Sequence, residues 1–327
     1  MATTTQRPEG GLGQDLLALE TQFRERVWGG QRLQAAQPPI GEAWLAYGQS
    51  VVETGPLAGR TLADLAVENG PALLGTSVFA RFGGRFPLLA KILDCAEWLS
   101  IQVHPNDEQA RRMVGAAAFG KTEAWYFLEA APDARILMGV KSGTTAAALE
   151  NAIREGRIIE FMREVQVGTG QAVLIPAGTL HALGPGLLLY EIQENSDTTY
   201  RAYDWGRPQT EGRKLHIEES VQVATTAGPG DLVTPTLAGT AAIARAIECD
   251  HFQVDLVRVG AAPLALDTKG VAFHIVTAVD GSAAVETAAE SVGLKRFQTV
   301  LVAGAAGAYR IRATSDSATL LKACVPV

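Results

Sequence analysis

Residues 170–183 read GQAVLIPAGTLHAL, and the fold of the chain is best inferred from this stretch. Counted from Gly170, five residues precede Pro176, one residue separates Pro176 from Gly178, and two more precede His181. A short apolar run that ends in proline and glycine is typical of a strand followed by a tight turn. The spacing therefore predicts a strand and a turn that place one histidine side chain at a fixed position in a β-sheet.

This spacing resembles the second motif of the cupin superfamily, which implies a jelly-roll barrel with a metal in its mouth. The residues alone also allow a plain buried histidine after a hairpin. Several short β-like runs follow a glycine- and proline-rich segment at 227–235, and one of them has cupin-like texture with alanines at the proline and histidine positions. We expect a mainly β protein of two cupin-type jelly-roll barrels, with a small helical cluster inserted in or beside the first.

Three regions are expected along the chain. Residues 1–14 are polar and predict a disordered tail, and residues 15–230 predict a catalytic metal-binding cupin domain. Apolar spacing of three and four residues indicates helical segments at about 107–118 and 144–166 in that domain. Residues 231–327 predict a degenerate, metal-free cupin-like β domain.

The composition of the chain argues against several classes of protein. With 47% hydrophobic and 19% charged residues in 327, the chain can bury a sizeable core without staples. A net charge of −7 and no basic stripe argue against nucleic acid, and no apolar run approaches the ~20 residues that a membrane helix needs. The start lacks the apolar region of a secretory signal, and three widely spaced cysteines indicate a reducing compartment. A cytoplasmic protein is expected.

A second informative stretch is LSIQVHPND, residues 99–107. Residues two apart on a strand project to the same face, so Ser100, Gln102 and His104 would share one face and Ile101 and Val103 the other. Such a strand suits the wall of a polar cavity. Taken alone, such a strand is more commonly a solvent-facing edge.

Two histidines need an oxygen donor to complete a metal site, and two glutamates compete for that role. Glu108 stands where the first cupin motif has its acid, but it also falls at the expected start of a helix, where an acid is favourable for structural reasons. Glu123 lies in GKTEAWYFLEA, two residues after Lys121 and on a strand that alternates with aromatic residues. Lys121 and Glu123 would form either a desolvated pair with shifted pKa values or a surface ion pair.

A third stretch, YEIQENSDTTYRAYDWGR at 190–207, combines acids with arginines. Glu191 lies on the strand expected after His181. The guanidinium groups of Arg201 and Arg207 are suited to binding phosphate or a developing oxyanion. A set of surface salt bridges is the alternative.

Taken together, these stretches and the earlier ERVWGGQRL and IGEAWLAYG resemble the type I mannose-6-phosphate isomerases in their compact bacterial form, from about residue 21 to 216. The resemblance implies a metal-dependent isomerase that interconverts mannose 6-phosphate and fructose 6-phosphate through a cis-enediol. It implies one Zn²⁺ per chain, although manganese, cobalt and iron accept similar ligands. An isomerase of another sugar or sugar phosphate, and a non-catalytic cupin that binds sugar phosphates, are the alternatives.

Carried over by position, the resemblance implies the following site. The metal ligands are Gln102, His104, Glu123 and His181. The catalytic residues are Arg201, with Glu191 as the first candidate for the base and Lys121 as the second. The substrate contacts are Ser100, Lys121 and Arg207. A small-molecule sugar phosphate is the expected partner, with no nucleic acid or membrane, and the chain is expected to be a monomer or small homo-oligomer.

Overall fold

The structure is a computed structural model that describes residues 12–237 and 242–327. Residues 1–11 of the expected tail lie outside the described residues. The last part of that tail is ordered, because Leu12 and Gln14 are buried. The Gln14 amide donates hydrogen bonds to the carbonyls of Leu16, at 2.9 Å, and Thr54, at 3.0 Å. The expectation of disorder up to residue 14 is therefore wrong for residues 12–14.

The chain forms two compact units that are each assembled from separate segments. Unit 1 contains the described residues up to 22, residues 45–87 and the described residues from 236 onward, and unit 2 contains residues 23–44 and 88–235. The expected domains, 15–230 and 231–327, treat each region as one continuous segment, whereas both units are assembled from separate segments. The early segments belong to unit 1 because the first strand pairs with a strand near the C-terminus, with Leu16 opposite Val302.

Unit 1 is an antiparallel β-structure with two helices. Its eight-stranded sheet has the order β1-β18-β16-β19-β14-β13, with β15 paired to β19 and β17 to β16. The strands are β1 (Leu16–Leu19), β13 (Ala242–Glu248), β14 (Gln253–Val259), β15 (Leu264–Asp267), β16 (His274–Glu286), β17 (Ser291–Leu294), β18 (Thr299–Val302) and β19 (Ala308–Cys324). The helices are α1 (Leu62–Leu74) and α2 (Thr76–Phe82), and a 3-10 turn spans Gly304–Ala306.

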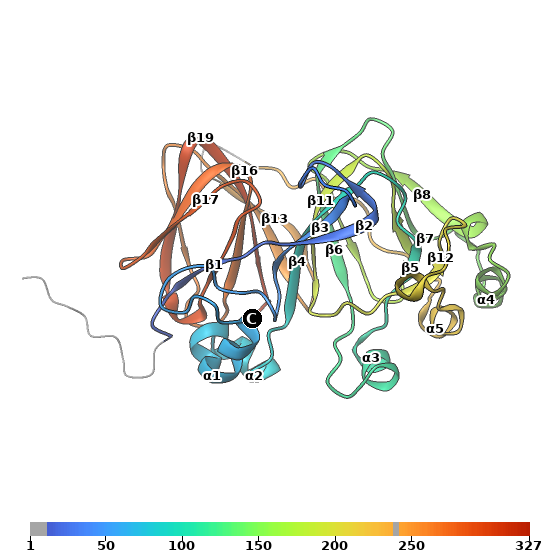
Figure 1. Ribbon diagram of the computed structural model, residues 1–327, viewed down its shortest axis with the longest axis horizontal. Coiled ribbons are helices and arrows are strands. Elements are labelled where there is room, and N and C mark those ends of the chain that lie inside the picture. The colour runs from blue at the N-terminus through green and yellow to red at the C-terminus, as the bar shows by residue number, and fades with distance from the viewer. Residues whose placement is uncertain (1–11, 238–241) are drawn as a thin grey trace, which may run out of the picture. The chain divides into compact units, whose positions relative to one another are not determined.

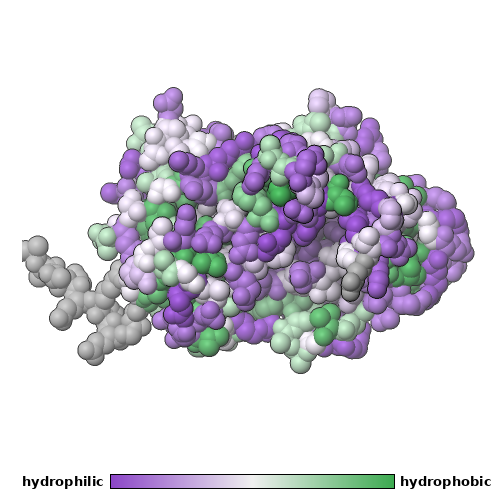
Figure 2. Space-filling view, in the orientation of Figure 1, coloured by the Kyte–Doolittle hydropathy of each residue, from purple (hydrophilic) through white to green (hydrophobic). Residues whose placement is uncertain are grey.

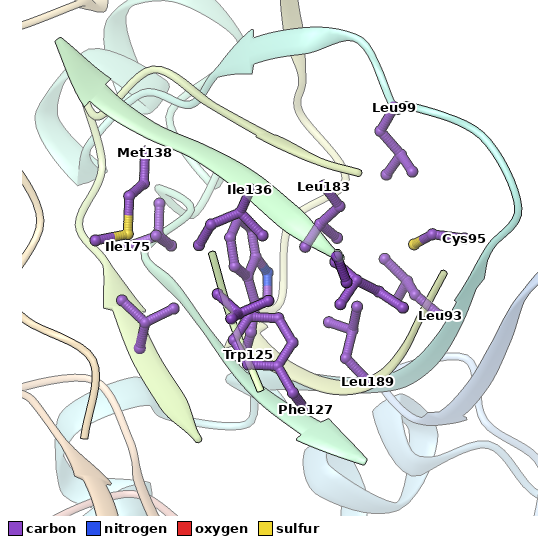
Figure 3. Close-up of a cluster of buried hydrophobic side chains, with 14 of the residues drawn as sticks. Leu93, Cys95, Leu99, Trp125, Phe127, Ile136, Met138, Ile175, Leu183 and Leu189 are labelled. Atoms are coloured by element: carbon purple, nitrogen blue, oxygen red, sulfur yellow. The ribbon is translucent and has the colours of Figure 1, made fainter. Parts of the chain in front are cut away.

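Unit 2 contains two sheets. The five-stranded sheet has the order β12 (Tyr200–Tyr203), β5 (Ile101–Val103), β10 (His181–Leu183), β7 (Arg135–Val140) and β8 (Met162–Gln166). The six-stranded sheet has the order β2 (Gln22–Gly30), β3 (Ile40–Ala46), β4 (Leu88–Cys95), β11 (Leu187–Glu194), β6 (Glu123–Ala130) and β9 (Ala172–Ile175). Side chains from both sheets meet in one apolar core around Trp125, Phe127 and Ile136 (Figure 3).

The helices of unit 2 lie outside this barrel (Figure 1). A second apolar cluster joins the other face of the five-stranded sheet to α4 (Ala146–Arg154) and α5 (Ile217–Val223), with Ile101 and Val103 among its members. Ile101 and Val103 therefore lie on the face that packs against the helices, as strand alternation predicts for residues 100–104. The expected fold class, two cupin-type jelly-roll barrels with a small helical cluster beside the first, is confirmed.

The expected helical segments are shorter than predicted. Helix α3 (Asp107–Met113) begins at a capping box, in which the Asn106 side chain accepts from the Gln109 backbone N–H at 2.9 Å, and it ends well before residue 118. The segment 144–166 is helical only over α4. Residues 158–161 form a 3-10 turn, and residues 162–166 form β8, with Glu164 opposite Leu137 on β7. The helix prediction was wrong for residues 162–166 because their apolar pattern fits a strand as well as a helix. Pairing with β7 selects the strand.

The exposed surface carries few large apolar groups. Figure 2 shows mostly hydrophilic residues on the face in view, with hydrophobic residues in small separate groups. Among the described residues, no helix has both the length and the apolar character needed to cross a membrane. All three cysteines are free.

Candidate metal centre

The turn predicted from GQAVLIPAGTLHAL is present and places His181 at the start of β10. The Thr179 N–H donates to the Pro176 carbonyl at 3.1 Å, and the Gly178 N–H donates to the His104 carbonyl at 2.8 Å. Gly178 has a φ of 84°, and a Cβ there would meet the Val223 carbonyl oxygen at 3.0 Å. Both the left-handed backbone and the close approach require glycine at this position. His181 then pairs with Gln102 on β5.

Three buried side chains converge between the two sheets of unit 2. His104 follows β5, His181 begins β10, and Glu123 begins β6 on the opposite sheet. The Glu123 carboxylate oxygens lie 3.3 Å from His104 Nε2 and 3.1 Å from His181 Nε2, and the three side chains are 0–1% exposed. The Gln102 side-chain amide lies 3.2 Å from His181 Nε2. Rotating that amide by half a turn would present its oxygen to the same point.

Both histidines are oriented by backbone carbonyls. The Nδ1 atoms of His104 and His181 lie 2.9 Å from the Thr198 carbonyl oxygen and 2.8 Å from the Thr179 carbonyl oxygen. Because a carbonyl only accepts, each Nδ1 carries the proton and each Nε2 presents its lone pair to the cluster. Metal-binding histidines are commonly held in this way.

The charge of the cluster suits a divalent cation. Burial lowers the pKa of His104 to about 3, the Lys121 ammonium adds to this effect, and the Glu123 carboxylate opposes it. For Glu123, burial raises the pKa, but the Lys121 ammonium, which is the largest opposing cause, and the contacts with the two histidine rings outweigh burial and hold the pKa well below its ordinary value. The cluster therefore offers a neutral imidazole at His104 and an ionised carboxylate at Glu123 at neutral pH.

A second observation, on the hydrogen bonding of Glu123, also indicates a metal site. Both Glu123 oxygens are buried and accept no hydrogen bond of good geometry from any described residue, although Lys121 Nζ lies 3.0 Å from Oε2. The Lys121 ammonium lies against Oε2 only, so Oε1 remains a buried anionic acceptor without a hydrogen bond, which is costly. Two nitrogen donors, one carboxylate and one amide match zinc and related first-row metals.

Glu123 lies in the cluster and Glu108 does not. The Glu108 side chain is 83% exposed on α3 and lies 3.8 Å from Arg112. Lys121 is buried, with its Nζ 3.0 Å from Glu123 Oε2 and 3.1 Å from His104 Nε2. Lys121 and Glu123 thus form the desolvated pair rather than the surface pair.

A cavity of about 520 Å³ in unit 2 opens beside this cluster. Five of the residues singled out from the sequence line it: Ser100, Gln102, Lys121, Glu191 and Arg201. The cavity is also lined by residues that sequence reasoning missed, among them Lys91, Glu42, Trp44, Arg213 and His216. The cavity is therefore bordered by groups that can bind a metal, transfer a proton and bind an anion.

Glu191 is held from two sides. Lys91 Nζ lies 3.0 Å from Oε1, and the Trp125 indole N–H donates to Oε2 at 3.0 Å. Burial lowers the pKa of Lys91, but the carboxylates of Glu191 and Glu42 outweigh burial and raise it. Lys91 was missed, although a lysine within the fully buried run FPLLAKIL is itself a signal, because lysines are almost never buried unpaired.

The two arginines of the third stretch separate. Arg201 lines the cavity and donates from Nε to Ser100 Oγ at 3.2 Å. Arg207 does not line the cavity, and its guanidinium lies 3.3 Å from Asp204 and 2.8 Å from Glu97. The chain turns between the two arginines, where Trp205 has a φ of 55°. The sequence could not show this turn, because only one of its residues is glycine.

The fold and the cluster define unit 2 as a cupin with a metal-type centre beside a polar, charge-lined cavity. Comparisons with known proteins agree. A family model for the phosphomannose isomerase type I catalytic domain matches residues 16–124. Mannose-6-phosphate isomerase ManA of Bacillus subtilis is 40% identical over 254 residues, covering 71% of this chain and 76% of that protein.

Solved structures extend the similarity to most of the chain. The mannose 6-phosphate isomerase from Bacillus subtilis has a TM-score of 0.83 at 29% identity, covering 95% of this chain and 99% of that one. A zinc-bound mannose 6-phosphate isomerase shares the fold, with a TM-score of 0.75 at 18% identity over 96% of this chain and 100% of that one. The chain belongs to the type I mannose-6-phosphate isomerase family.

Proposed function

We propose that this protein is a metal-dependent aldose–ketose isomerase that interconverts mannose 6-phosphate and fructose 6-phosphate. The observation that carries the proposal is the meeting of His104, Glu123 and His181 beside a cavity that also presents Glu191 and Arg201. A binding protein would need the cluster for affinity but has no use for a carboxylate base and an arginine in the same cavity. Family membership supports the same activity.

Zinc is the proposed metal, held by Gln102, His104, Glu123 and His181. When bound, the ion supplies a Lewis acid that polarises the sugar carbonyl and offsets the charge of an enediolate. Gln102 is the neutral member of the set, so the site keeps more positive charge than two carboxylates would leave. Zinc-bound relatives of the same fold are in keeping with this choice.

Glu191 is the proposed base that takes the proton from C2 and returns it to C1 of the cis-enediol. Its carboxylate lines the cavity, and Lys91 and Trp125 hold it in one orientation. Lys121 was the second candidate. Its ammonium is paired with the buried Glu123 carboxylate, and a charged ammonium has no lone pair with which to accept a proton.

Arg201 is proposed to offset the negative charge of the bound substrate, with Ser100 and Lys121 as further substrate contacts. The Arg201 guanidinium donates from Nε to Ser100 and from Nη1 to the Lys214 carbonyl, at 3.2 and 2.9 Å. These bonds fix its position before substrate binds, so little reorganisation is needed during the reaction.

Metal removal tests the proposed function directly. The purified protein is expected to contain about one zinc per chain by elemental analysis and to convert mannose 6-phosphate to fructose 6-phosphate. Chelation should abolish turnover, and adding zinc, manganese or cobalt back should restore it to different extents. Assays with other aldose phosphates and with free mannose in parallel separate the alternatives. Tight binding of fructose 6-phosphate without any turnover would instead show that the protein is a non-catalytic cupin that binds sugar phosphates.

Arg201→Ala is expected to retain metal but lower kcat/KM by about 100- to 1000-fold, the range for losing one preorganised charged donor. Metal content and steady-state kinetics measure the two effects separately. Arg135→Gln is the matched control, because Arg135 forms an exposed pair with Glu164 and lies outside the cavity. Unchanged turnover in Arg201→Ala would exclude this residue from catalysis.

We also propose a cytoplasmic location, a monomer or small homo-oligomer, and no nucleic-acid or membrane partner. The net charge of −7 and the three free cysteines support these assignments.

A further inference from the structure

We propose that Arg213 and His216, together with Arg201, bind the phosphate group of the substrate, and that Arg207 acts only through Asp204. The inference rests on the proposed function, because it assigns the phosphate end of the same cavity. It replaces the expectation that Arg207 contacts the phosphate. Four observations on this part of unit 2 lead to it.

Arg213 presents an unused donor to the cavity. It ends the 3-10 turn Glu211–Arg213, and its Nη2 donates to both carboxylate oxygens of Asp204, at 2.6 and 2.7 Å, while its Nε donates at 3.0 Å. Asp204 is buried, so this pairing fixes the guanidinium plane. Among the side chains that the structure describes, none accepts a hydrogen bond from Nη1. Since Arg213 lines the cavity, a held arginine with a spare donor suits an incoming anion.

Arg201 supplies a second spare donor. Its Nε and Nη1 bind Ser100 and the Lys214 carbonyl, and its Nη2 has no hydrogen bond to any described residue. Arg201 lies near Arg213, because its Nη1 donates to the carbonyl of Lys214, the next residue in the chain. Burial lowers the pKa of Arg201, and the charge of Arg213 lowers it further. Two like charges at one end of a cavity repel, and a phosphate dianion between them would remove that repulsion.

His216 completes the set as a neutral donor. The backbone N–H of Arg201 donates to His216 Nδ1 at 3.2 Å, so Nδ1 is the acceptor and Nε2 carries the proton. Burial and the charge of Arg201 lower the pKa of His216, which keeps the ring uncharged at neutral pH. His216 also lines the cavity, where an Nε2–H can donate to a phosphate oxygen.

Arg207 is engaged elsewhere. Its Nη1 donates to Asp204 Oδ1 at 3.3 Å and its Nη2 to Glu97 at 2.8 Å, and it does not line the cavity. Asp204 therefore receives two arginines and cannot fully neutralise Arg213. Arg207 thus acts as a positioning residue that leaves positive charge available on Arg213.

The test compares Arg213→Gln with Arg207→Gln, and with Arg135→Gln as a surface control. Arg213→Gln is expected to raise the KM for mannose 6-phosphate by about 10- to 100-fold, the range for one lost charged hydrogen-bonding group, with little change in kcat. The dissociation constant for inorganic phosphate, measured by calorimetry on the metal-loaded protein, should rise by a similar factor. Arg207→Gln should shift both values less than Arg213→Gln does.

The inference is overturned if Arg213→Gln leaves KM and phosphate binding unchanged, or if Arg207→Gln has the larger effect. If Arg213→Gln is poorly folded, Asp204→Asn combined with Arg213→Gln removes both members of the buried pair and is judged by the same criteria. A wild-type protein that does not isomerise mannose 6-phosphate would defeat the proposed function alone. Phosphate calorimetry would still decide the role of Arg213.

Discussion

Replacing Glu123 by glutamine is expected to remove the bound metal and lower kcat/KM by at least about a thousandfold, which corresponds to about 4 kcal/mol of transition-state stabilisation. Glu123 is the one anionic member of the four proposed ligands, and its two oxygens face the Nε2 atoms of both histidines. The substitution also leaves the buried Lys121 ammonium without its carboxylate partner. Elemental analysis and kinetics on the same preparation measure both losses.

Glu108→Gln is the matched control, since the two glutamates were the rival ligands in the sequence. Glu108 is exposed on α3, so the substitution should leave metal content, KM and kcat at wild-type values. Metal retained at full occupancy in Glu123→Gln, or lost in Glu108→Gln, would refute the ligand assignment.

Glu191→Gln is expected to keep its metal but lose about 100- to 10,000-fold in kcat, the usual contribution of a positioned base. The glutamine has the same shape and can still accept the Trp125 N–H, so the substitution removes mainly the proton acceptor. Exchange of the C2 hydrogen of mannose 6-phosphate with deuterated solvent, followed by NMR, isolates the step in question. Exchange at the wild-type rate in Glu191→Gln would show that another group is the base.

Lys91→Met serves as the control for that experiment. It removes the ammonium that lies 3.0 Å from Glu191 Oε1 while leaving the carboxylate in place. The Glu191 carboxylate keeps its hydrogen bond from Trp125 but loses one of the two groups that orient it, so Lys91→Met should reduce turnover less than Glu191→Gln does. An equal or larger loss in Lys91→Met would mean that the lysine itself carries the proton transfer.

Much of the fold was predictable because local patterns and long-range packing agree. The turn at 176–179 depends on Pro176 and Gly178, whose backbone preferences are visible in the sequence. The strand β8 was missed because residues 162–166 fit two periodicities, and only pairing with β7 selects one. The division into units depends on which distant strands pair, and no local pattern of residues 45–87 shows that they belong with the C-terminal strands.

The candidate site was predictable only in part. Strand alternation places Ser100, Gln102 and His104 together, but the choice of Glu123 over Glu108 came from family resemblance. Lys91 and Glu191 meet because their strands pair in one register, with Lys91 opposite Glu191 on β4 and β11. Arg213 follows an irregular segment after β12, where neither period-two nor helical spacing indicates which way a side chain points.

The pairing of β1 with β18 affects how the chain folds during synthesis and which fragments of it can fold. The segment that forms β1 is synthesised long before the segment that forms β18, so its partner strand is absent while the residues between them are translated. Contacts of such long sequence separation are slow to form, so unit 1 should close last and a trapped β1 would stall it. For the same reason neither unit corresponds to a single continuous segment, and a fragment of residues 15–230 would lack β18, the partner strand of β1.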